Sequence, residues 1–220
     1  MSIAVQQSLL DLCDQAAPGA TEPDRVPLSR GAWIDVQRGW LSGSAGLFAR
    51  LAETVPWRAE RRRMYDRTVD VPRLLRFYGD DEPLPDPALG ACRAALSAHY
   101  AAELGEPFVT AGLCFYRDGR DSVAWHGDRI GRGSAQDTMV AIVSIGAARP
   151  LLLRPAGAAP AGTAPRQDGG PGPTLRYRLG HGDLLVMGGS CQRTWEHAVP
   201  KSARPTGPRI SIQFRPRNVR

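Results

Sequence analysis

FVTAGLCFYRDGRDSVAWHGD, residues 108–128, contains two short runs of β-branched and aromatic residues separated by a turn rich in Asp and Gly. Six similar runs follow it, each bounded by Gly, Pro or Asp. They lie at residues 138–146, 150–155, 174–179, 183–189, 193–199 and 209–215. A succession of about eight short strands is typical of a β-sandwich or a β-barrel.

Two helices are predicted in the part of the chain that precedes these strands. Residues 42–55 carry Leu and Val at four-residue spacing behind Ser42 or Ser44 as a cap, which predicts a short amphipathic helix. Residues 86–105 begin with an Asp-Pro pair and end at a glycine, the usual start and stop signals of a helix. The second segment is the clearest helix of the sequence.

These elements suggest an α+β portion at residues 1–105 and an all-β portion at residues 106–220, packed together as a single domain. The expected fold class is therefore mainly β with flanking helices. A stretch of Pro, Gly and Ala at residues 155–173 lies between two predicted strands. Because it has almost nothing to bury, it is expected to form a mobile surface loop.

The composition is that of an ordinary globular protein, with 42% hydrophobic and 23% charged residues. No apolar run is long enough to cross a bilayer, so no membrane association is expected. The first residues carry two aspartates where a signal peptide needs an apolar stretch, which favours a cytoplasmic location. The four cysteines are scattered without a CxxC pair, which argues against a zinc cluster and fits unpaired thiols.

The net charge of +6 would help the protein to approach a polyanion such as nucleic acid. Only Lys201 is a lysine among the 28 basic residues, so the same charge also fits the arginine-rich amino-acid usage of a GC-rich genome. Charge alone leaves both explanations open.

His126 and Asp128 are two residues apart in a segment with the pattern of a strand. Side chains at this spacing project from the same face, and Gly127 leaves room between them. One imidazole and one carboxylate, joined by a distant second histidine, make the facial triad that binds Fe(II) and leaves positions open for substrate and O2. His197 is the best third ligand, because its late predicted strand can return beside the first.

A His-x-Asp pair by itself more often forms a turn or a hydrogen-bonded pair than a metal site. The sequence contains a second copy, His181 and Asp183, which is flanked by glycines and followed by a hydrophobic run. This copy is predicted to be a β-turn. His99 lies in the second predicted helix and is expected to be a surface or packed residue.

The last predicted strand bears on the same site. Alternation places three apolar residues on one face and, on the other, Arg209, Ser211, Gln213 and Arg215. An ordinary half-exposed strand would keep these arginines in water, but this strand begins twelve residues after His197, close enough to form the next strand beside the metal site. Two inward guanidiniums would need an anion, and a dicarboxylate fits their bidentate geometry, so a 2-oxo acid co-substrate is expected.

Three stretches of the sequence are GLCFYRDGRDSVAWHGD (112–128), LGHGDLLVMGGSCQRTWEHAVP (179–200) and GPRISIQFR (207–215). Taken in order, they resemble the AlkB-type Fe(II)- and 2-oxoglutarate-dependent dioxygenases, whose pattern is an HxD…H triad followed by an RxxxxxR strand. The match is dense over residues 110–217 and continues weakly back through VPRLLRFYGDDEPLP (71–85). The resemblance implies a double-stranded β-helix (jelly-roll) core with an N-terminal α/β substrate-recognition portion.

The resemblance also implies roles for single residues. The three triad residues would hold iron and form the catalytic centre. Arg209 and Arg215 would hold the two ends of 2-oxoglutarate, Tyr116 would donate a hydrogen bond to it, and O2 would be the second co-substrate. Gln213 would line the same pocket.

Two positions depart from the family pattern. The family usually has Asn two residues before the tyrosine, whereas this chain has Cys114 at that place in the co-substrate pocket, a weaker hydrogen-bonding group. The DNA-repair members carry an acidic residue directly after the triad aspartate, whereas this chain has Arg129 at this position on the substrate side.

The similarity further points to a substrate lid in RLLRFYGDDEP, residues 73–83. Tyr78 and Gly79 would belong to the lid that holds an unstacked base, while Arg73 and the arginine run at 61–63 would contact the phosphate backbone. The alternatives are that Tyr78 is an ordinary core or rim aromatic and that the arginine run is a solvated face.

The resemblance implies an oxidative demethylase of N-alkylated bases in DNA or RNA, which uses Fe(II), 2-oxoglutarate and O2 and releases succinate, CO2 and formaldehyde. The protein is expected to be a monomer. A hydroxylase of a small molecule or a protein side chain would use the same site, and the two departures permit it. A metal-free nucleic-acid-binding module on the same β-core is a third hypothesis. The presence of all three ligands and both arginines argues against it.

Overall fold

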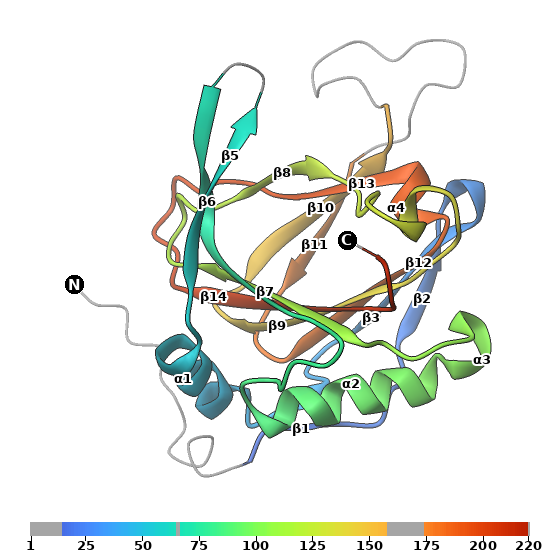
Figure 1. The fold of residues 1–220 in the computed structure, drawn as a ribbon, viewed down its shortest axis with the longest axis horizontal. Helices are drawn as coiled ribbons and strands as arrows, with labels where there is room; N and C mark the ends of the chain where they lie inside the picture. Colours follow the sequence, from blue (N-terminus) through green and yellow to red (C-terminus); the bar gives the residue numbers. More distant parts are fainter. Residues whose placement is uncertain (1–14, 65–66, 158–173, 220) are drawn as a thin grey trace.

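The computed structural model describes residues 15–64, 67–157 and 174–219. Its strands form a large sheet, a small sheet and a two-stranded ribbon (Figure 1). The strand order is β2-β3-β12-β9-β14-β7-β6-β5 in the large sheet, β11-β10-β13-β8 in the small sheet and β1-β4 in the ribbon.

The bounds of the elements are as follows. The strands are β1 Ala17–Pro18, β2 Asp24–Pro27, β3 Ala32–Gln37, β4 Leu41–Ser42, β5 Arg58–Met64, β6 Arg67–Tyr78, β7 Thr110–Tyr116, β8 Val123–His126, β9 Val140–Gly146, β10 Arg149–Pro155, β11 Leu175–Leu179, β12 Asp183–Gly189, β13 Trp195–Val199 and β14 Arg209–Arg215. The helices are α1 Ser44–Thr54, α2 Pro87–His99, α3 Ala101–Leu104 and α4 Cys191–Thr194, with short 3-10 turns η1 Ser29–Gly31 and η2 Arg132–Ser134.

The eight strands predicted after residue 107 are all present, as β7 to β14. Four of them, β12, β9, β14 and β7, form the centre of the large sheet, and the other four form the small sheet. Neighbouring strands are antiparallel. Two facing four-stranded sheets of this kind make a jelly roll, so the predicted mainly β fold with a double-stranded β-helix core is confirmed.

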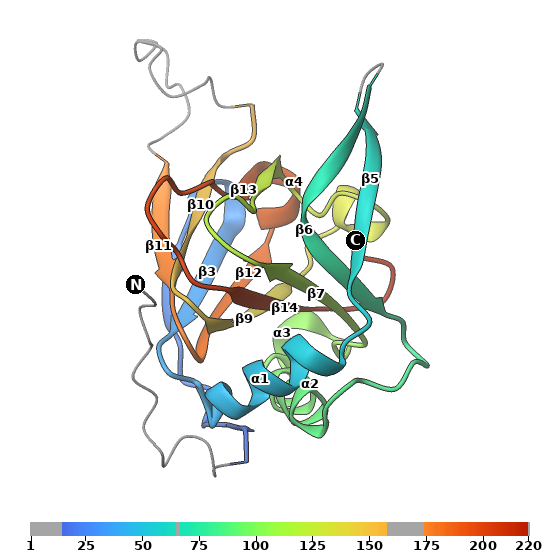
Figure 2. The ribbon, with the colours of Figure 1, turned by 90° about the vertical axis from the view of Figure 1, so that its left-hand side faces the viewer.

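Two apolar layers hold this architecture together. Strand β9 contributes to both layers, because it buries side chains on both of its faces. Val143 of β9 belongs to the layer that packs against α1 and α2, together with Ile212 of β14. Ile142 of β9 belongs to the layer between the two sheets, together with Leu153 of β10. The helices therefore cover one face of the large sheet and the small sheet covers the other (Figure 2).

The helix predictions need two corrections. Helix α1 begins at Ser44, but its cap is Gly43 in the left-handed conformation (φ 57°), so the predicted serine cap is wrong. Helix α2 begins as predicted, since the side chain of Asp86 accepts a hydrogen bond from the N–H two residues later. The helix predicted to continue to Gly105 is instead divided at Tyr100 into α2 and α3.

The N-terminal portion extends the large sheet at both edges, which the sequence pattern did not indicate. Strand β3 pairs with β12 at one edge, and β6 pairs with β7 at the other. Strand β6 thereby becomes a wall beside the strands that carry the site. The sheet thus contains strands from both predicted portions of the chain.

Strand β14 lies in the large sheet between β9 and β7. It lies beside the metal site as predicted, but it approaches from the opposite sheet, where its Arg215 contacts Asp128 (2.7 Å). The metal-bearing strand β8 pairs with β13 in the small sheet, and β14 faces that sheet from the other side of the jelly roll.

Three smaller predictions concern the rest of the chain. The loop predicted at residues 155–173 lies almost wholly outside the described residues, which end at 157 and resume at 174. Cys92, Cys114 and Cys191 are unpaired, as predicted, and Cys13 lies outside the described residues. Among the residues described, no helix has the length and apolar content needed to cross a membrane.

Candidate active site

The predicted metal ligands come together at the edge of the small sheet. His126 of β8 is paired directly with His197 of β13, and the centroids of their rings are 4.2 Å apart. The carboxylate of Asp128 joins them from the loop that follows β8. The ligand atoms of the three side chains all lie within 4.8 Å of one another, and in the described part of the chain this is the only group of three that could hold a metal ion.

The backbone after β8 is shaped for this convergence. Strand β8 ends at His126. Asp128 was predicted to lie on this strand, but it lies in the loop that follows it. A Cβ at Gly127 would come within 2.6 Å of the Gln192 carbonyl oxygen, so only glycine fits between the two ligands. The Oε1 atom of Gln192 accepts a hydrogen bond from the N–H of Asp128 (3.1 Å). Nothing in the sequence marks Gln192 for this role.

The protonation states of the triad suit a divalent metal. Burial lowers the pKa of His197 to about 3 and also lowers that of His126, so both imidazoles are neutral at physiological pH. Burial alone would raise the pKa of Asp128, but the Arg215 guanidinium lowers it to about 2. The Nδ1 atom of His126 is 2.8 Å from the carbonyl oxygen of Ala124, which leaves Nε2 for a ligand. Metal ligands must be deprotonated, so these three side chains can bind a metal ion in the protonation states that they already have.

Strand β14 turns its polar face toward this triad from the opposite sheet. As predicted, Ile210, Ile212 and Phe214 point the other way and pack in the layer under the helices. Arg209 and Gln213 are buried between the sheets. The alternation of this strand was therefore predictable from the sequence, although its neighbours in the sheet were not.

Arg209 is a buried guanidinium without a counter-ion among the described residues. It is 1% exposed, its Nε donates a hydrogen bond to Oγ of Ser144 (2.8 Å), and its Nη1 has no hydrogen-bond partner in the part of the chain that is described. Burial lowers the pKa of Arg209. A buried guanidinium nitrogen without an acceptor is costly, so this position is suited to a carboxylate of a bound ligand.

Arg215 differs from Arg209 in having a carboxylate partner already. Its Nε donates to Oδ2 of Asp128 at a distance of 2.7 Å. Asp128 thus neutralises the charge of Arg215, whereas Arg209 has no counter-ion among the described residues. That Arg215 also holds one end of a bound dicarboxylate stays a prediction. The ion pair also joins β14 of the large sheet to the loop after β8.

Tyr116, Cys114 and Gln213 line the same interior face. Tyr116 is paired with Arg209 across β7 and β14, and the centre of the guanidinium lies 5.3 Å from the ring centroid. Burial raises the pKa of Tyr116 to about 12, so its hydroxyl stays protonated and can donate a hydrogen bond. The Cys114 thiol is 3.7 Å from Oε1 of Gln213, whose Nε2 donates to the backbone and hydroxyl oxygens of Ser211 (3.0 and 2.6 Å).

Arg73 lies on the interior wall and not on the outer surface where a phosphate backbone was predicted to pass. Its Nη1 donates to the carbonyl oxygen of Ser122 (3.2 Å), and its Nε is buried without a hydrogen-bond partner among the described residues. Burial would lower its pKa, but Cys114 and Tyr116 raise it. These neighbours place the guanidinium beside the co-substrate pocket.

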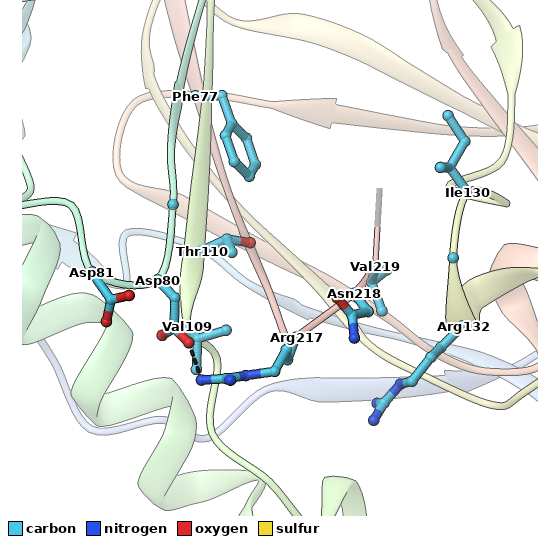
Figure 3. A pocket seen from close by; sticks show the side chains of 12 residues that line it. Phe77, Asp80, Asp81, Val109, Thr110, Ile130, Arg132, Arg217, Asn218 and Val219 are labelled. Carbon is cyan, nitrogen blue, oxygen red and sulfur yellow. Dashed lines mark hydrogen bonds and ion pairs between the residues drawn. The ribbon is translucent and has the colours of Figure 1, made fainter.

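The aromatic residue that strand β6 offers to a ligand is Phe77, which was not predicted from the sequence. Tyr78 is paired with Ala111 on the helix-facing side, is 4% exposed and packs in the core, so it is a core aromatic. Phe77 is paired with Gly112 on the opposite face and is 36% exposed. Figure 3 shows Phe77 at a pocket of about 850 Å³, which Gly79 also lines.

Arg129 lies on the rim beside the triad. Its Nε is 3.4 Å from the carbonyl oxygen of Gln192, and its Nη2 is 3.8 Å from Oε1 of Glu196 on β13. The side chain is partly exposed, so a ligand that enters over the triad can reach it. Of the arginine run at 61–63, Arg61 is exposed and the other two side chains lie outside the described residues.

The second His-x-Asp copy has a structural role, as predicted. The Nδ1 atom of His181 accepts a hydrogen bond from the N–H of Gly146 (2.7 Å). Asp183 is buried, accepts a hydrogen bond from the N–H of Gly180 (2.7 Å) and pairs with Arg38 (2.6 Å). These contacts hold a turn, and the two side chains do not belong to the candidate metal group.

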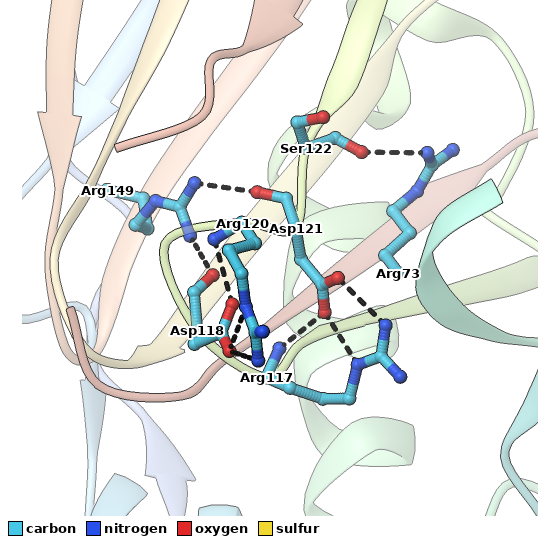
Figure 4. Close-up of polar contacts among 7 residues, drawn as sticks. All are labelled: Arg73, Arg117, Asp118, Arg120, Asp121, Ser122 and Arg149. Carbon is cyan, nitrogen blue, oxygen red and sulfur yellow. Dashed lines mark hydrogen bonds and ion pairs between the residues drawn. The ribbon is translucent and has the colours of Figure 1, made fainter. Parts of the chain in front are cut away.

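A buried arginine fixes the far ends of the two strands that carry the triad (Figure 4). Nη1 of Arg149 on β10 donates to the carbonyl oxygen of Asp118 (2.9 Å), and Nη2 donates to those of Asp121 (2.9 Å) and Pro200 (2.8 Å). The two aspartates lie in the loop that leads into β8, and Pro200 follows β13 directly. One guanidinium therefore ties together the start of one strand and the end of the other.

Replacing Arg149 with methionine is expected to lower the free energy of unfolding by about 3 kcal/mol, because three carbonyl groups lose their donor. Urea denaturation of the two proteins measures the difference. The matched control is Arg117→Met, which removes a partly exposed ion pair with Asp121 and is expected to cost less than about 1 kcal/mol. Equal losses in both variants would contradict the special role of Arg149.

The residues present fit a metal ion and an anionic co-substrate. Two neutral imidazoles and one carboxylate form the donor set of a facial triad, which suits Fe(II). The buried Nη1 of Arg209 needs an acceptor that the described residues do not supply. A molecule that carries a carboxylate and binds between the two sheets would satisfy it.

Comparison with known proteins identifies the family. The family model of the 2OG-Fe(II) oxygenase superfamily matches residues 76–215, a span that contains the triad and β14. The chain belongs to the 2OG-Fe(II) oxygenase superfamily. Its relatives include alkB homologues, so the AlkB-type resemblance noted in the sequence is confirmed.

Three relatives illustrate the match. Alpha-ketoglutarate-dependent dioxygenase alkB homolog 3 of Homo sapiens is 29% identical over 208 residues, which are 89% of this chain and 67% of that protein. The Rattus norvegicus homolog is 31% identical over 183 residues, 77% of this chain and 58% of that protein. DNA oxidative demethylase ALKBH2 of Arabidopsis thaliana is 34% identical over 130 residues, 54% and 41% of the two chains. The matched part covers between 58% and 67% of the alkB homolog 3 proteins.

The solved structure of OsALKBH1 resembles this oxygenase with a TM-score of 0.54 and 15% sequence identity. The alignment covers 87% of this chain and 99% of that chain. Likeness at this identity concerns the fold alone, and it agrees with the jelly-roll core described above.

Proposed function

We propose that this chain is an Fe(II)- and 2-oxoglutarate-dependent oxidative demethylase of N-alkylated bases in DNA or RNA. The observation that carries the proposal is the meeting of two histidines, a carboxylate and an arginine without a counter-ion between the two sheets. The relatives include proteins named DNA oxidative demethylase, which supports a nucleic-acid substrate. The products would be succinate, CO2, formaldehyde and the repaired base.

In this proposal iron is held by His126, Asp128 and His197. When bound, iron, 2-oxoglutarate and O2 together supply the oxidation that puts a hydroxyl group on the methyl carbon. Arg209 binds one carboxylate of 2-oxoglutarate, and the protonated hydroxyl of Tyr116 donates a hydrogen bond to it. Arg215 holds Asp128 in position through their ion pair.

The substrate side of the proposal concerns how a base enters. A methyl group on a stacked base cannot reach a metal that lies between two sheets, so the nucleotide has to be unstacked first. Arg129 on the rim and Arg73 on the interior wall are the guanidiniums that an entering base meets. The net charge of +6 favours approach to a polyanion, and a monomeric, cytoplasmic protein is proposed with it.

An assay of formaldehyde release tests the proposal. Single-stranded oligonucleotides that carry 1-methyladenine or 3-methylcytosine are incubated with the protein, Fe(II), 2-oxoglutarate and ascorbate. The wild-type protein is expected to release formaldehyde, and His126→Ala is expected to release none, because it removes one of three metal ligands. The matched control is His99→Ala, which removes an exposed histidine of α2 and should leave the rate unchanged.

Two outcomes would change the proposal. Turnover of 2-oxoglutarate to succinate without any product from the oligonucleotides would favour a hydroxylase of a small molecule or a protein side chain, which Arg129 and Cys114 permit. A wild-type protein that binds no metal and turns over no 2-oxoglutarate would leave only the metal-free binding module.

A further inference from the structure

A groove opens beside the candidate active site, between strand β6 and the loop that follows β8. Its lining includes Phe77, Thr110, Ile130, Arg132 and Arg217, and its volume is about 850 Å³. Phe77 and Ile130 stand on opposite walls, and Arg217 lies between them at the lower end (Figure 3). None of the residues predicted for iron or 2-oxoglutarate lines it.

The groove shares a wall with the triad. Ile130 lies two residues after Asp128. On the other side, Thr110 is paired with Arg215 across β7 and β14, and Arg215 makes the ion pair with Asp128 (2.7 Å). A Cβ at Gly112, the partner of Phe77, would lie 3.0 Å from Nη1 of Arg215. The groove and the metal group are therefore separated by little more than one guanidinium.

The apolar residues of the groove are unusually exposed. The described chain exposes three large hydrophobic residues, and two of them, Phe77 (36%) and Ile130 (70%), face this groove. The third is Val26, on β2 at the opposite edge of the large sheet. Exposed apolar side chains gathered on two walls of one groove mark a binding surface, whereas a single exposed one needs no explanation.

The charged residues of the groove identify the partner. Arg217 makes an exposed ion pair with Asp80, whereas the pair of Arg132 with Glu106 is partly buried. Asp81 also lines the groove. An exposed ion pair is weak, so a phosphate can replace the carboxylate of Asp80 with a bidentate contact to Arg217. An aromatic face with guanidiniums beside it is the combination that binds single-stranded nucleic acid, in which bases stack on aromatic rings and phosphates meet arginines.

We propose that the groove binds the nucleotide next to the target base in a single strand, with its base between Phe77 and Ile130 and its phosphate at Arg217. The inference rests on the proposed function, because it assigns the neighbour of the base that enters the active site. A base held between two side chains has lost its stacking partners, so a continuous duplex cannot occupy the groove in this way. The preferred substrate is therefore a single strand.

Binding measurements on a matched set of variants test the inference. Fluorescence anisotropy gives the Kd of a labelled oligonucleotide that carries one 3-methylcytosine, with Mn(II) in place of iron and 2-oxoglutarate present. Phe77→Ser and Ile130→Ser are each expected to raise the Kd about tenfold, the loss typical of one stacked base. Val26→Ser is the control, because Val26 is as exposed as Phe77 but lies remote from the groove, and it should leave the Kd unchanged. Thermal melting of each variant checks that it is folded.

A change in the oligonucleotide makes the test specific to stacking. Removing the base on one side of the 3-methylcytosine should weaken binding to the wild-type protein about tenfold. The same removal should not weaken binding to the Phe77→Ser variant further, because the substitution and the base removal each abolish the same contact between ring and base. In a separate arm, Arg217→Gln should reduce the slope of log Kd against log salt concentration by about 0.7, the value for one phosphate contact on a single strand.

The outcomes separate this inference from the proposed function. A wild-type protein that demethylates the oligonucleotide, together with a Phe77→Ser variant of unchanged Kd, would overturn the groove inference alone. Equal weakening in Phe77→Ser and Val26→Ser would overturn it as well. So would the finding that the effects of Phe77→Ser and of base removal on Kd add up, whichever side of the 3-methylcytosine the base is removed from. A wild-type protein that demethylates no oligonucleotide would overturn the proposed function first.

Discussion

Replacing His197 with alanine is expected to abolish turnover and to weaken metal binding by more than about 100-fold. Loss of residues that only support a metal ligand already costs about 10- to 100-fold, and His197 is itself one of the three side chains whose ligand atoms lie within 4.8 Å. The remaining imidazole and carboxylate cannot form a facial triad. His197 is buried and neutral, with its pKa lowered to about 3, so its loss leaves no unpaired charge behind.

Two measurements check this prediction. Isothermal titration with Mn(II) gives the affinity for metal, and formaldehyde release with Fe(II) gives the turnover. His197→Gln accompanies the alanine variant, because it fills more of the buried space and guards against a loss of fold. His99→Ala is the matched control on the exposed surface of α2. Metal affinity or turnover near the wild-type value in both His197 variants would show that the metal is held elsewhere.

Replacing Arg209 with methionine is expected to raise the KM for 2-oxoglutarate by about 100-fold, since removing one partner of a buried charge pair costs about 2–5 kcal/mol. Arg209 is 1% exposed, and its Nη1 has no partner among the described residues. Without co-substrate this buried charge opposes folding, so the variant should be at least as stable as the wild-type protein. The stabilisation that 2-oxoglutarate gives to the wild-type protein should disappear.

Thermal melting with and without 2-oxoglutarate, alongside KM and kcat, distinguishes a binding role from a structural one. A structural role predicts a lower melting temperature of the free protein, whereas a binding role predicts a lost shift on adding 2-oxoglutarate. Arg117→Met is the control, because it removes an arginine that is partly exposed and pairs with Asp121 away from the interior face. A KM within about twofold of wild type would contradict the assignment of Arg209.

The metal group was predictable because its chemistry restricts the residue types. A chain with four histidines offers few ways to build a triad, and glycines on either side of His181 already indicated a turn for the second copy. The eight strands after residue 107 were visible as short β-branched and aromatic runs between turn residues. Alternation along β14 then fixed which of its side chains share a face with Arg209.

The contacts between distant segments were not predictable. The segment before Gly79 contains adjacent aromatic residues, Phe77 and Tyr78, and only the pairing of β6 with β7 decides which one faces the interior side. The ion pair between Arg215 and Asp128 crosses from one sheet to the other, so no local pattern reports it. Gln192 acts through a single contact with a backbone N–H, which any polar residue in the sequence could make.

The two halves of the active site belong to different sheets. The histidines lie on the small sheet, and Arg209 lies on the large one. Apolar side chains such as Ile142, Leu153 and Met187 fill the layer between the sheets and set how far apart they stand. Since protein interiors are densely packed, a methyl group gained or lost in this layer changes that separation. Substitutions in this layer can thus change the distance between the metal ligands and the co-substrate pocket, and with it the rate of turnover, although these residues contact neither the substrate nor the co-substrate.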